Sequence, residues 1–141
     1  MQNLTKIICL LLINISFSFA QENQNQNVTV NISNLSSNEG KVFVAIYNSE
    51  DSFLNNGFKS LIAKIDANTC SVTFKDIPKG TYAISVFHDE NDNNKMDSNF
   101  LGIPKEDYGC SNNVKGFMGP PKWEDAKFKL NNQSVIHNIQ L

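Results

Sequence analysis

Apolar and polar residues alternate with a period of two along much of the chain. Between Val28 and Ile32 every second residue is apolar, and the alternation recurs over 69–74, 126–130 and 134–141. Residues two apart lie on the same face of a β-strand. The pattern therefore predicts strands that each place one apolar face against a core.

The segment 41–48 is apolar on both faces. Its two faces consist of Val42, Val44 and Ile46 and of Phe43, Ala45 and Tyr47. Strands that are covered on both sides have this composition. We therefore expect a central strand, or one whose outer face is covered.

Turn residues separate the predicted strands. Asp66-Ala67-Asn68 has hairpin chemistry between strands expected over 58–65 and 69–74, and Asn131-Asn132 gives a tight turn before the last strand. The pattern amounts to seven strands with no convincing helix. The predicted fold is all-β: a single seven-stranded antiparallel Greek-key β-sandwich, Ig-like or prealbumin-like, over residues 28–141.

The turn before the strand at 82–87 is the clearest local signature. Pro78 fixes its own φ, and Gly80 is free to adopt a positive φ. Tyr82 follows at a place that resembles the tyrosine corner of Greek-key sandwiches, whose hydroxyl bonds back to the preceding backbone. We expect Tyr82 to be structural.

Residues 1–20 have the parts of a secretory signal peptide. A lysine precedes the apolar run Ile7–Ile15, and Ser18-Phe19-Ala20 ends in small residues suited to cleavage. The run is shorter than the roughly 20 residues of a membrane span. We expect an exported protein, periplasmic or extracellular and without a membrane span, that begins with a disordered lead-in at 21–27.

Composition narrows the classes of partner. The chain has no arginine, and removal of residues 1–20 leaves 11 lysines against 14 acidic residues, a net charge of −3. Nucleic-acid sites normally use a basic surface and the bidentate guanidinium group. Nucleic acid is therefore not an expected partner.

Two cysteines follow residue 20. Export usually means an oxidising compartment, in which Cys70 and Cys110 can form a disulfide. Against a bridge, Cys70 alternates with Val72 and Phe74 and so points into the core, whereas Cys110 lies in a loop. The sequence is consistent both with a Cys70–Cys110 disulfide and with a buried, free Cys70.

A run of acidic and amide residues after the strand at 82–87 has the spacing of a calcium loop. Calcium takes oxygen ligands, and alternate residues of a coiled loop can direct their oxygens to one centre. The candidate ligands, at positions 1, 3, 5, 7 and 9, are Asp89, Asn91, Asn93, the carbonyl of Lys95 and Asp97. Met96 is expected to hold the loop against the body as an apolar plug.

The loop departs from a calcium site at its end. Position 6, usually glycine, is Asn94, which tolerates a positive φ, and position 12, usually a bidentate glutamate, is Phe100. The expected Kd is about 10⁻⁴–10⁻³ M unless Asp92, Glu106 or Asp107 also contributes. The alternative is a metal-free loop in which Asp and Asn side chains cap their own backbone.

One long segment, 74–113, has a distinctive sequence. It reads FKDIPKGTYAISVFHDENDNNKMDSNFLGIPKEDYGCSNN, with KVFVAIYNSEDSF before it and GFMGPPKWEDAKF after it. The chain resembles the DUF2141 family of exported bacterial proteins over essentially all of its length after residue 20. The resemblance implies the fold and export, and no activity, because the family's function is unknown. Family members resemble DENGNGKLD across the loop, where Asp92 and Asn94 replace two glycines, and usually carry an apolar residue at the position of Cys110.

The segment 102–125 is long for a connection without regular structure, and such loops are often functional or packed down. Tyr108, Phe117 and Trp123 make it a candidate ligand loop. In one interpretation its aromatic residues form a platform for a sugar or peptide. In the other, which we prefer, they fold back as a lid over the end of the sandwich.

Catalysis has little support. No nucleophile-elbow motif accompanies His88 or His137, and His137 shares a strand face with apolar residues. The expected function is an exported non-catalytic module, with a weak Ca²⁺ loop, that binds a peptide, glycan or cell-envelope partner. The alternative is a hydrolase or isomerase that uses His88 and the neighbouring carboxylates.

Overall fold

A computed structural model describes residues 25–141. The signal peptide predicted at 1–20 therefore lies outside the described residues. The described residues form eight strands, one 3₁₀ turn and one short helix: β1 (Gln26–Ser33), β2 (Lys41–Tyr47), β3 (Lys59–Ala63), β4 (Cys70–Ile77), β5 (Gly80–Asp89), β6 (Tyr108–Cys110), η1 (Ser111–Asn113), α2 (Trp123–Ala126), β7 (Phe128–Leu130) and β8 (Val135–Gln140).

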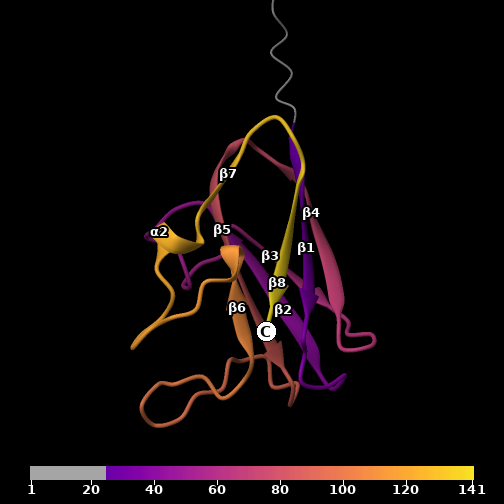
Figure 1. Cartoon of the computed structure of the whole chain (residues 1–141), viewed down its shortest axis with the longest axis vertical. Coiled ribbons are helices and arrows are strands. Elements are labelled where there is room, and N and C mark those ends of the chain that lie inside the picture. The colour runs from indigo at the N-terminus through magenta and orange to yellow at the C-terminus, as the bar shows by residue number, and fades with distance from the viewer. Residues whose placement is uncertain (1–24) are drawn as a thin grey trace, which may run out of the picture.

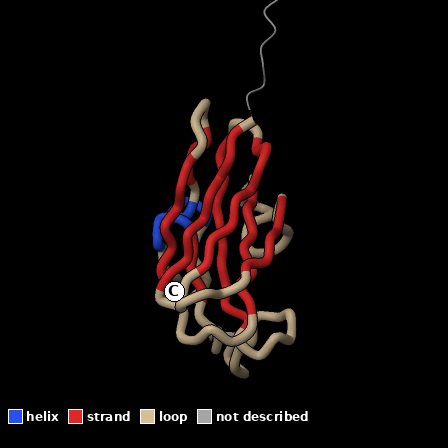
Figure 2. Tube along the Cα trace, turned by 90° about the vertical axis from the view of Figure 1, so that its right-hand side faces the viewer, coloured by secondary structure: helices blue, strands red, loops and turns tan. Residues whose placement is uncertain are grey.

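The strands lie in two sheets, which run along the long axis of the molecule (Figures 1 and 2). One sheet has the order β4-β1-β8, and the other has the order β3-β2-β5-β6, with β7 also paired to β5. Neighbouring strands are antiparallel except β1 and β8, which run parallel. The predicted all-β class is confirmed, with eight strands rather than seven in the described part. None of the helices in residues 25–141 is long and apolar enough to cross a membrane.

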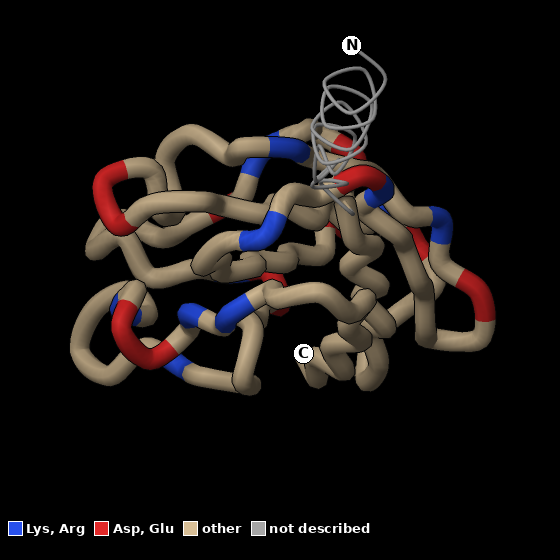
Figure 3. The backbone as a smooth tube through the Cα atoms, turned by 90° about the horizontal axis from the view of Figure 1, so that it is seen from above, with Lys and Arg blue, Asp and Glu red and all other residues tan. Residues whose placement is uncertain are grey.

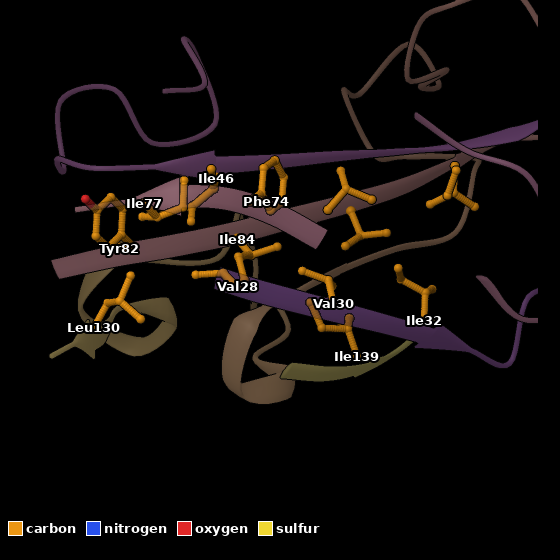
Figure 4. Packing of buried hydrophobic residues seen from close by; sticks show 14 of the residues in the cluster. Val28, Val30, Ile32, Ile46, Phe74, Ile77, Tyr82, Ile84, Leu130 and Ile139 are labelled. Carbon is orange, nitrogen blue, oxygen red and sulfur yellow. The ribbon is translucent and has the colours of Figure 1, made fainter. Parts of the chain in front are cut away.

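Branched aliphatic side chains fill the space between the sheets (Figure 4). The alternation of side chains along a strand sends every second residue inward, and β-branched residues suit a pleated surface. Buried members of this core include Val28, Val30, Ile32, Val42, Val44, Ile46, Phe74, Ile84, Val86 and Ile139. The inward face predicted for 28–32 is therefore confirmed, and β2 is a central strand, as expected for 41–48, because it pairs with β3 and β5.

Tyr82 ties the two sheets together where the chain passes from β4 to β5. Its Oη donates a hydrogen bond of 2.8 Å to the carbonyl of Pro78, which confirms the expected structural role. The positive φ of this turn lies at Asp76 (57°) and not at Gly80, so that part of the prediction is wrong. Gly80 is needed for space, because a Cβ there would lie 3.1 Å from the Tyr82 ring.

The turn at Asp66–Thr69 connects the two sheets instead of closing a hairpin. Its backbone bonds measure 2.9 and 3.0 Å, and Ala67 and Asn68 have positive φ, so the predicted turn chemistry is confirmed. The predicted pairing is wrong, because β3 pairs with β2 and β4 pairs with β1. A tight turn sets only the local reversal, while long-range packing selects the partner of each strand.

β1 begins earlier than expected. Gln26 is buried, and the backbone N–H of Asn27 donates to Ser134 Oγ at 3.0 Å. The predicted disordered lead-in at 21–27 is therefore wrong for these two residues. The pairing partners that order them lie far away in sequence, and a local composition argument cannot detect them.

Charged residues are interspersed along the loops and outer strands (Figure 3). Acidic and basic positions are both spread around the molecule in this view. The more distinctive surface is apolar, and it lies on the outer face of the five-stranded sheet.

Candidate functional site

The outer face of the five-stranded sheet carries large and small side chains in separate rows. Cross-strand register aligns them across β3, β2, β5 and β6. The aromatic row consists of Phe43, Phe87 and Tyr108, and the small row consists of Ser60, Ala45, Ser85 and Cys110. In the aromatic row, the rings of Phe43 and Phe87 stack with centroids 4.9 Å apart and planes 5° apart.

The small row lies at the bottom of an apolar groove of about 1010 Å³, the outer groove. Its walls come from two loops, the β5–β6 loop and the β6–α2 segment, which extend to the same side of the molecule (Figure 1). The wall residues include Met96, Leu101, Ile103 and Pro104 from the first loop and Met118, Pro120 and Pro121 from the second. Short side chains between aromatic neighbours leave the space that longer ones would fill.

The polar groups of the outer groove are few and uncharged. Tyr47 Oη and Ser85 Oγ hydrogen-bond to each other at 2.9 Å, and Ser60 and Tyr108 add two more hydroxyls. The described lining residues include no Asp, Glu, Lys or His. A pocket of several hundred cubic ångströms, mostly apolar with a few polar groups, is the usual form of a small-ligand site.

The three aromatic residues of the predicted ligand loop have different environments. Tyr108 lies in β6 and lines the outer groove, while Phe117, in the wall segment, is 91% exposed. Trp123 is buried and packs edge-on against Phe53, with centroids 5.8 Å apart. The preferred lid interpretation is wrong for Phe117, because its side chain is exposed and does not fold back onto the sandwich.

Trp123 instead belongs to a second, smaller core that borders the outer groove on the side of Tyr47. This core consists of Tyr47, Phe53, Ala83, Cys110, Trp123 and Ala126. Ser111 ties it to the sheet: its Oγ accepts from the N–H of Ile84 at 2.9 Å and donates to the carbonyl of Ala126 at 2.5 Å. The segment 102–125 therefore contains β6, η1 and α2, although the sequence predicts no regular structure there.

The two cysteines are free thiols on different sheets. Cys70 is half-buried in β4 against the main core, and burial raises its pKa to about 11. Cys110 is buried in β6 and not in a loop, which corrects the sequence interpretation. Burial raises the pKa of Cys110 to about 12, although the charge of Lys115 lowers it. Because the thiolate is the nucleophile, both are poor candidates for nucleophilic chemistry.

Asp89 organises the start of the predicted calcium loop. Its carboxylate is buried and accepts backbone N–H bonds from Asn93 at 3.0 Å and from Asn94 at 2.8 Å. Lys41 Nζ lies 3.8 Å from Asp89 Oδ2 and also pairs with Asp92. The carboxylate at position 1 thus closes the loop through its own backbone.

The other candidate ligands gather around Asp97. Asn91 and Asn93 donate from Nδ2 to Asp97 Oδ2 at 2.6 and 3.0 Å, and the N–H of Lys95 donates to Asn93 Oδ1 at 2.8 Å. Glu106 also reaches the loop, where Oε2 accepts from the N–H of Asp97 at 2.9 Å. The loop oxygens therefore bond to N–H groups, as in the metal-free alternative. Across residues 25–141, no three His, Cys, Asp or Glu side chains are placed to hold a metal ion.

Two positive φ angles shape the loop. Asn94 has a φ of 64°, which confirms the left-handed conformation expected at position 6, and Asp92 has a φ of 60°. These are the two positions at which the family resemblance implies glycine. Met96 is 40% exposed and lines the outer groove, so its predicted role as a buried plug is wrong.

Lys41 connects this loop to the outer groove, and the sequence interpretation missed it. Besides Asp89 and Asp92, its ammonium lies 5.6 Å from the centroid of the Phe43 ring. The small row was also missed. Its signal is a short side chain on the outer face of each strand: Ala45 lies between Phe43 and Tyr47 in β2, and Ser85 precedes Phe87 on the same face of β5.

The two histidine side chains are buried or half-buried and contact neighbouring groups of the fold. His88 is 1% exposed, and its Nε2 lies 2.8 Å from the carbonyl oxygen of Glu39. His137 is half-buried, as predicted, with its ring centroid 4.0 Å from that of Phe128. Burial lowers the pKa of His137. Neither imidazole faces the outer groove.

Comparison with known proteins leaves the function open. No curated protein and no solved structure matches the chain. One family model matches residues 30–138, and its description is "Uncharacterized protein conserved in bacteria (DUF2141)". The match spans nearly all of both sheets. The chain therefore belongs to the DUF2141 family.

Proposed function

We propose that this protein is an exported, non-catalytic binding module whose ligand lies in the outer groove. The observation that carries the proposal is the groove itself: about 1010 Å³ of mostly apolar space beside three hydroxyl-bearing residues of the sheet and the phenol of Tyr108. Apolar surface left open to water is costly, so a ligand that covers it gains binding free energy. The sequence suggests a peptide, a glycan or a cell-envelope component as that ligand.

The observed positions of the histidines weigh against the catalytic alternative. A hydrolase or isomerase needs an acid or base within reach of its substrate. His88 is buried and its Nε2 already contacts Glu39, and the carboxylate of Asp89 accepts two backbone bonds. Binding therefore remains the better-supported function.

Nile red, a neutral apolar dye, tests the groove directly by fluorescence titration. Ser60→Phe places a ring over the β3 end of the small row and should abolish or strongly weaken dye binding. Ser71→Phe, on exposed β4 of the other sheet, is the matched control and should bind like the wild type. Equal dye affinity for Ser60→Phe and the wild type, with circular dichroism showing both folded, would overturn the proposal.

The loop at Asp89–Asp97 is proposed as a weak Ca²⁺ site. Support comes from the gathered side chains of Asn91, Asn93 and Asp97 and from the positive φ at Asn94. Binding requires Asn91 and Asn93 to turn their amide oxygens inward, since the amide nitrogens now donate to Asp97.

Thermal unfolding with calcium tests this site. With a Kd of about 10⁻⁴–10⁻³ M, 10 mM Ca²⁺ should stabilise the fold by roughly 1.4–2.7 kcal/mol. Asp97→Asn should remove that increment, whereas Asp66→Asn, in an exposed turn, should keep it. Identical melting temperatures with and without Ca²⁺ in the wild type would rule out the site.

We further propose a Greek-key, Ig-like or prealbumin-like topology for the two sheets. Consecutive strands change sheet at β1–β2, β3–β4, β4–β5 and β7–β8 among the described residues, and Tyr82 bonds to Pro78 as in a tyrosine corner. An experimental structure in which β3 pairs with β4 as a hairpin would contradict this topology.

Export through the signal at 1–20 is likewise a proposal, supported by its apolar run and small residues near residue 20. Mass spectrometry of the protein recovered from the periplasm or medium should give a chain that begins at Gln21. A chain that retains residues 1–20 in the cytoplasm would contradict it.

A further inference from the structure

The shape of the outer groove restricts what can lie in it. The small row crosses the strands from β3 to β6, a span of three interstrand spacings of about 4.8 Å, or roughly 14 Å. The aromatic row borders it on one side, and Tyr47, with the second core behind it, borders it on the other. The bottom of the groove is therefore long and about one side chain wide.

The chemistry of the lining favours an apolar chain over a polar one. The backbone groups of β2 and β5 are engaged on both sides in the sheet, so they cannot bond an extended peptide laid across it. Such a peptide would leave its own N–H and C=O groups unpaired, at a considerable cost. A glycan carries hydroxyls along its length, whereas Tyr47 and Ser85 already bond to each other. The lining instead suits a linear hydrocarbon.

Lysines stand next to residues that line the outer groove. Lys115 follows η1, is exposed and directly precedes Gly116, which belongs to the groove lining. Lys105 and Lys122 immediately follow the two wall segments. None of these three lysines takes part in the ion pairs found among residues 25–141. A ligand with an anionic end therefore has a counter-charge at the β6 end of the groove.

We propose that the outer groove binds a free long-chain fatty acid, with its alkyl chain along the small row and its carboxylate beside Lys115. This inference rests on the proposed binding function and narrows the class of ligand. A single alkyl chain fits along a floor that is one side chain wide. Met118, which is exposed and lines the groove from the wall segment, can contact the bound chain.

Displacement of Nile red by saturated fatty acids, below their micelle concentrations, tests the inference. Affinity should rise about fourfold for each added methylene among the shorter acids, and then level off once the chain exceeds the groove. Lys115→Gln should weaken palmitate binding about two- to fivefold and leave hexadecanol unchanged, because only palmitate carries a charge. Lys129→Gln, on exposed β7, is the matched control and should change neither.

The outcomes separate this inference from the proposed function. Nile red binding that is lost in Ser60→Phe but not displaced by any fatty acid would overturn the inference and leave the binding function standing. No Nile red binding at all would overturn both. Displacement by phosphatidylcholine vesicles but not by palmitate would replace the free acid with a membrane lipid. Equal palmitate affinity in Lys115→Gln and the wild type would overturn the placement of the carboxylate.

Discussion

The two faces of β2 and β5 are built from different side chains, although the same strands carry both. The inner face has Val44, Ile46 and Ile84, which are fully buried against the other sheet. The outer face has rings next to small residues, and a groove opens above the small ones. The inner side chains fill the space against the other sheet, whereas the short side chains of the outer face leave a hollow between the rings and the wall loops. One face therefore stabilises the fold, and the other carries the groove in which we propose that a ligand binds.

Truncating a phenylalanine on each face should give the largest difference in the free energy of unfolding. Phe74→Ala, in the inner core, should lower the free energy of unfolding by about 3–5 kcal/mol, because it leaves a cavity. Phe43→Ala, half-buried on the outer face, should cost about 0.5–1.5 kcal/mol, chiefly the loss of its stacking with Phe87. Urea midpoints at constant m-value measure both. Equal losses would show that the outer face is as tightly packed as the core.

Replacing an alanine on each face with a larger residue should show which face has room for added atoms. Ala63→Leu, on the inner side of β3, should destabilise by about 1–3 kcal/mol, because the core has no room for the added methyl groups. Ala45→Leu points into the outer groove and should change stability by less than about 0.5 kcal/mol. It should nevertheless weaken Nile red binding. A large loss of stability in Ala45→Leu would mean that the groove closes in solution.

Removing a tyrosine hydroxyl from each face should give a smaller difference in the free energy of unfolding. Tyr82→Phe loses the bond to the Pro78 carbonyl at the corner and should cost about 0.5–1.5 kcal/mol. Tyr47→Phe loses only its bond to Ser85, which water in the open groove can replace, so we expect less than about 0.5 kcal/mol. Thermal unfolding of both variants against the wild type measures this. A greater loss in Tyr47→Phe would reverse the ranking of the two faces.

The smallest expected effect is the pH dependence caused by His137. Burial lowers its pKa in the folded protein, so the unfolded chain takes up the proton first as the pH falls. Stability should therefore be complete above the ordinary histidine pKa of about 6.5 and decline below it until the pH passes the folded pKa. His137→Gln should show a shallower decline between pH 7.5 and 5, measured by urea unfolding. Parallel curves of stability against pH for the wild type and His137→Gln would contradict this assignment to His137.

Some features follow from the sequence because their causes are local. Alternation of side chains is a property of a few neighbouring residues, and it correctly assigned the inward face of β1. The corner at Pro78–Tyr82 and the left-handed Asn94 depend on residues within one turn, so they could also be predicted. The gathering of Asn91, Asn93 and Asp97 belongs to the same class, since all three lie on a single short loop.

Other features could not be predicted because distant residues decide them. The turn at Asp66–Thr69 has hairpin chemistry, yet its two strands enter different sheets, since their partners lie tens of residues away. Lys41 reaches the acidic loop only because β2 pairs with β5 in a register that brings it opposite Asp89. Gln26 pairs with Ile77 in β4, and Cys110 is buried against Trp123 and Ala126 of α2.

The sequence by itself determined the all-β class, the family and the positions at which the chain can turn. Only the tertiary structure decided that Ser60, Ala45, Ser85 and Cys110 lie side by side as the floor of a groove. The physical reason is that a row across a sheet takes one residue from each strand. Its members are far apart along the chain, and strand register alone aligns them.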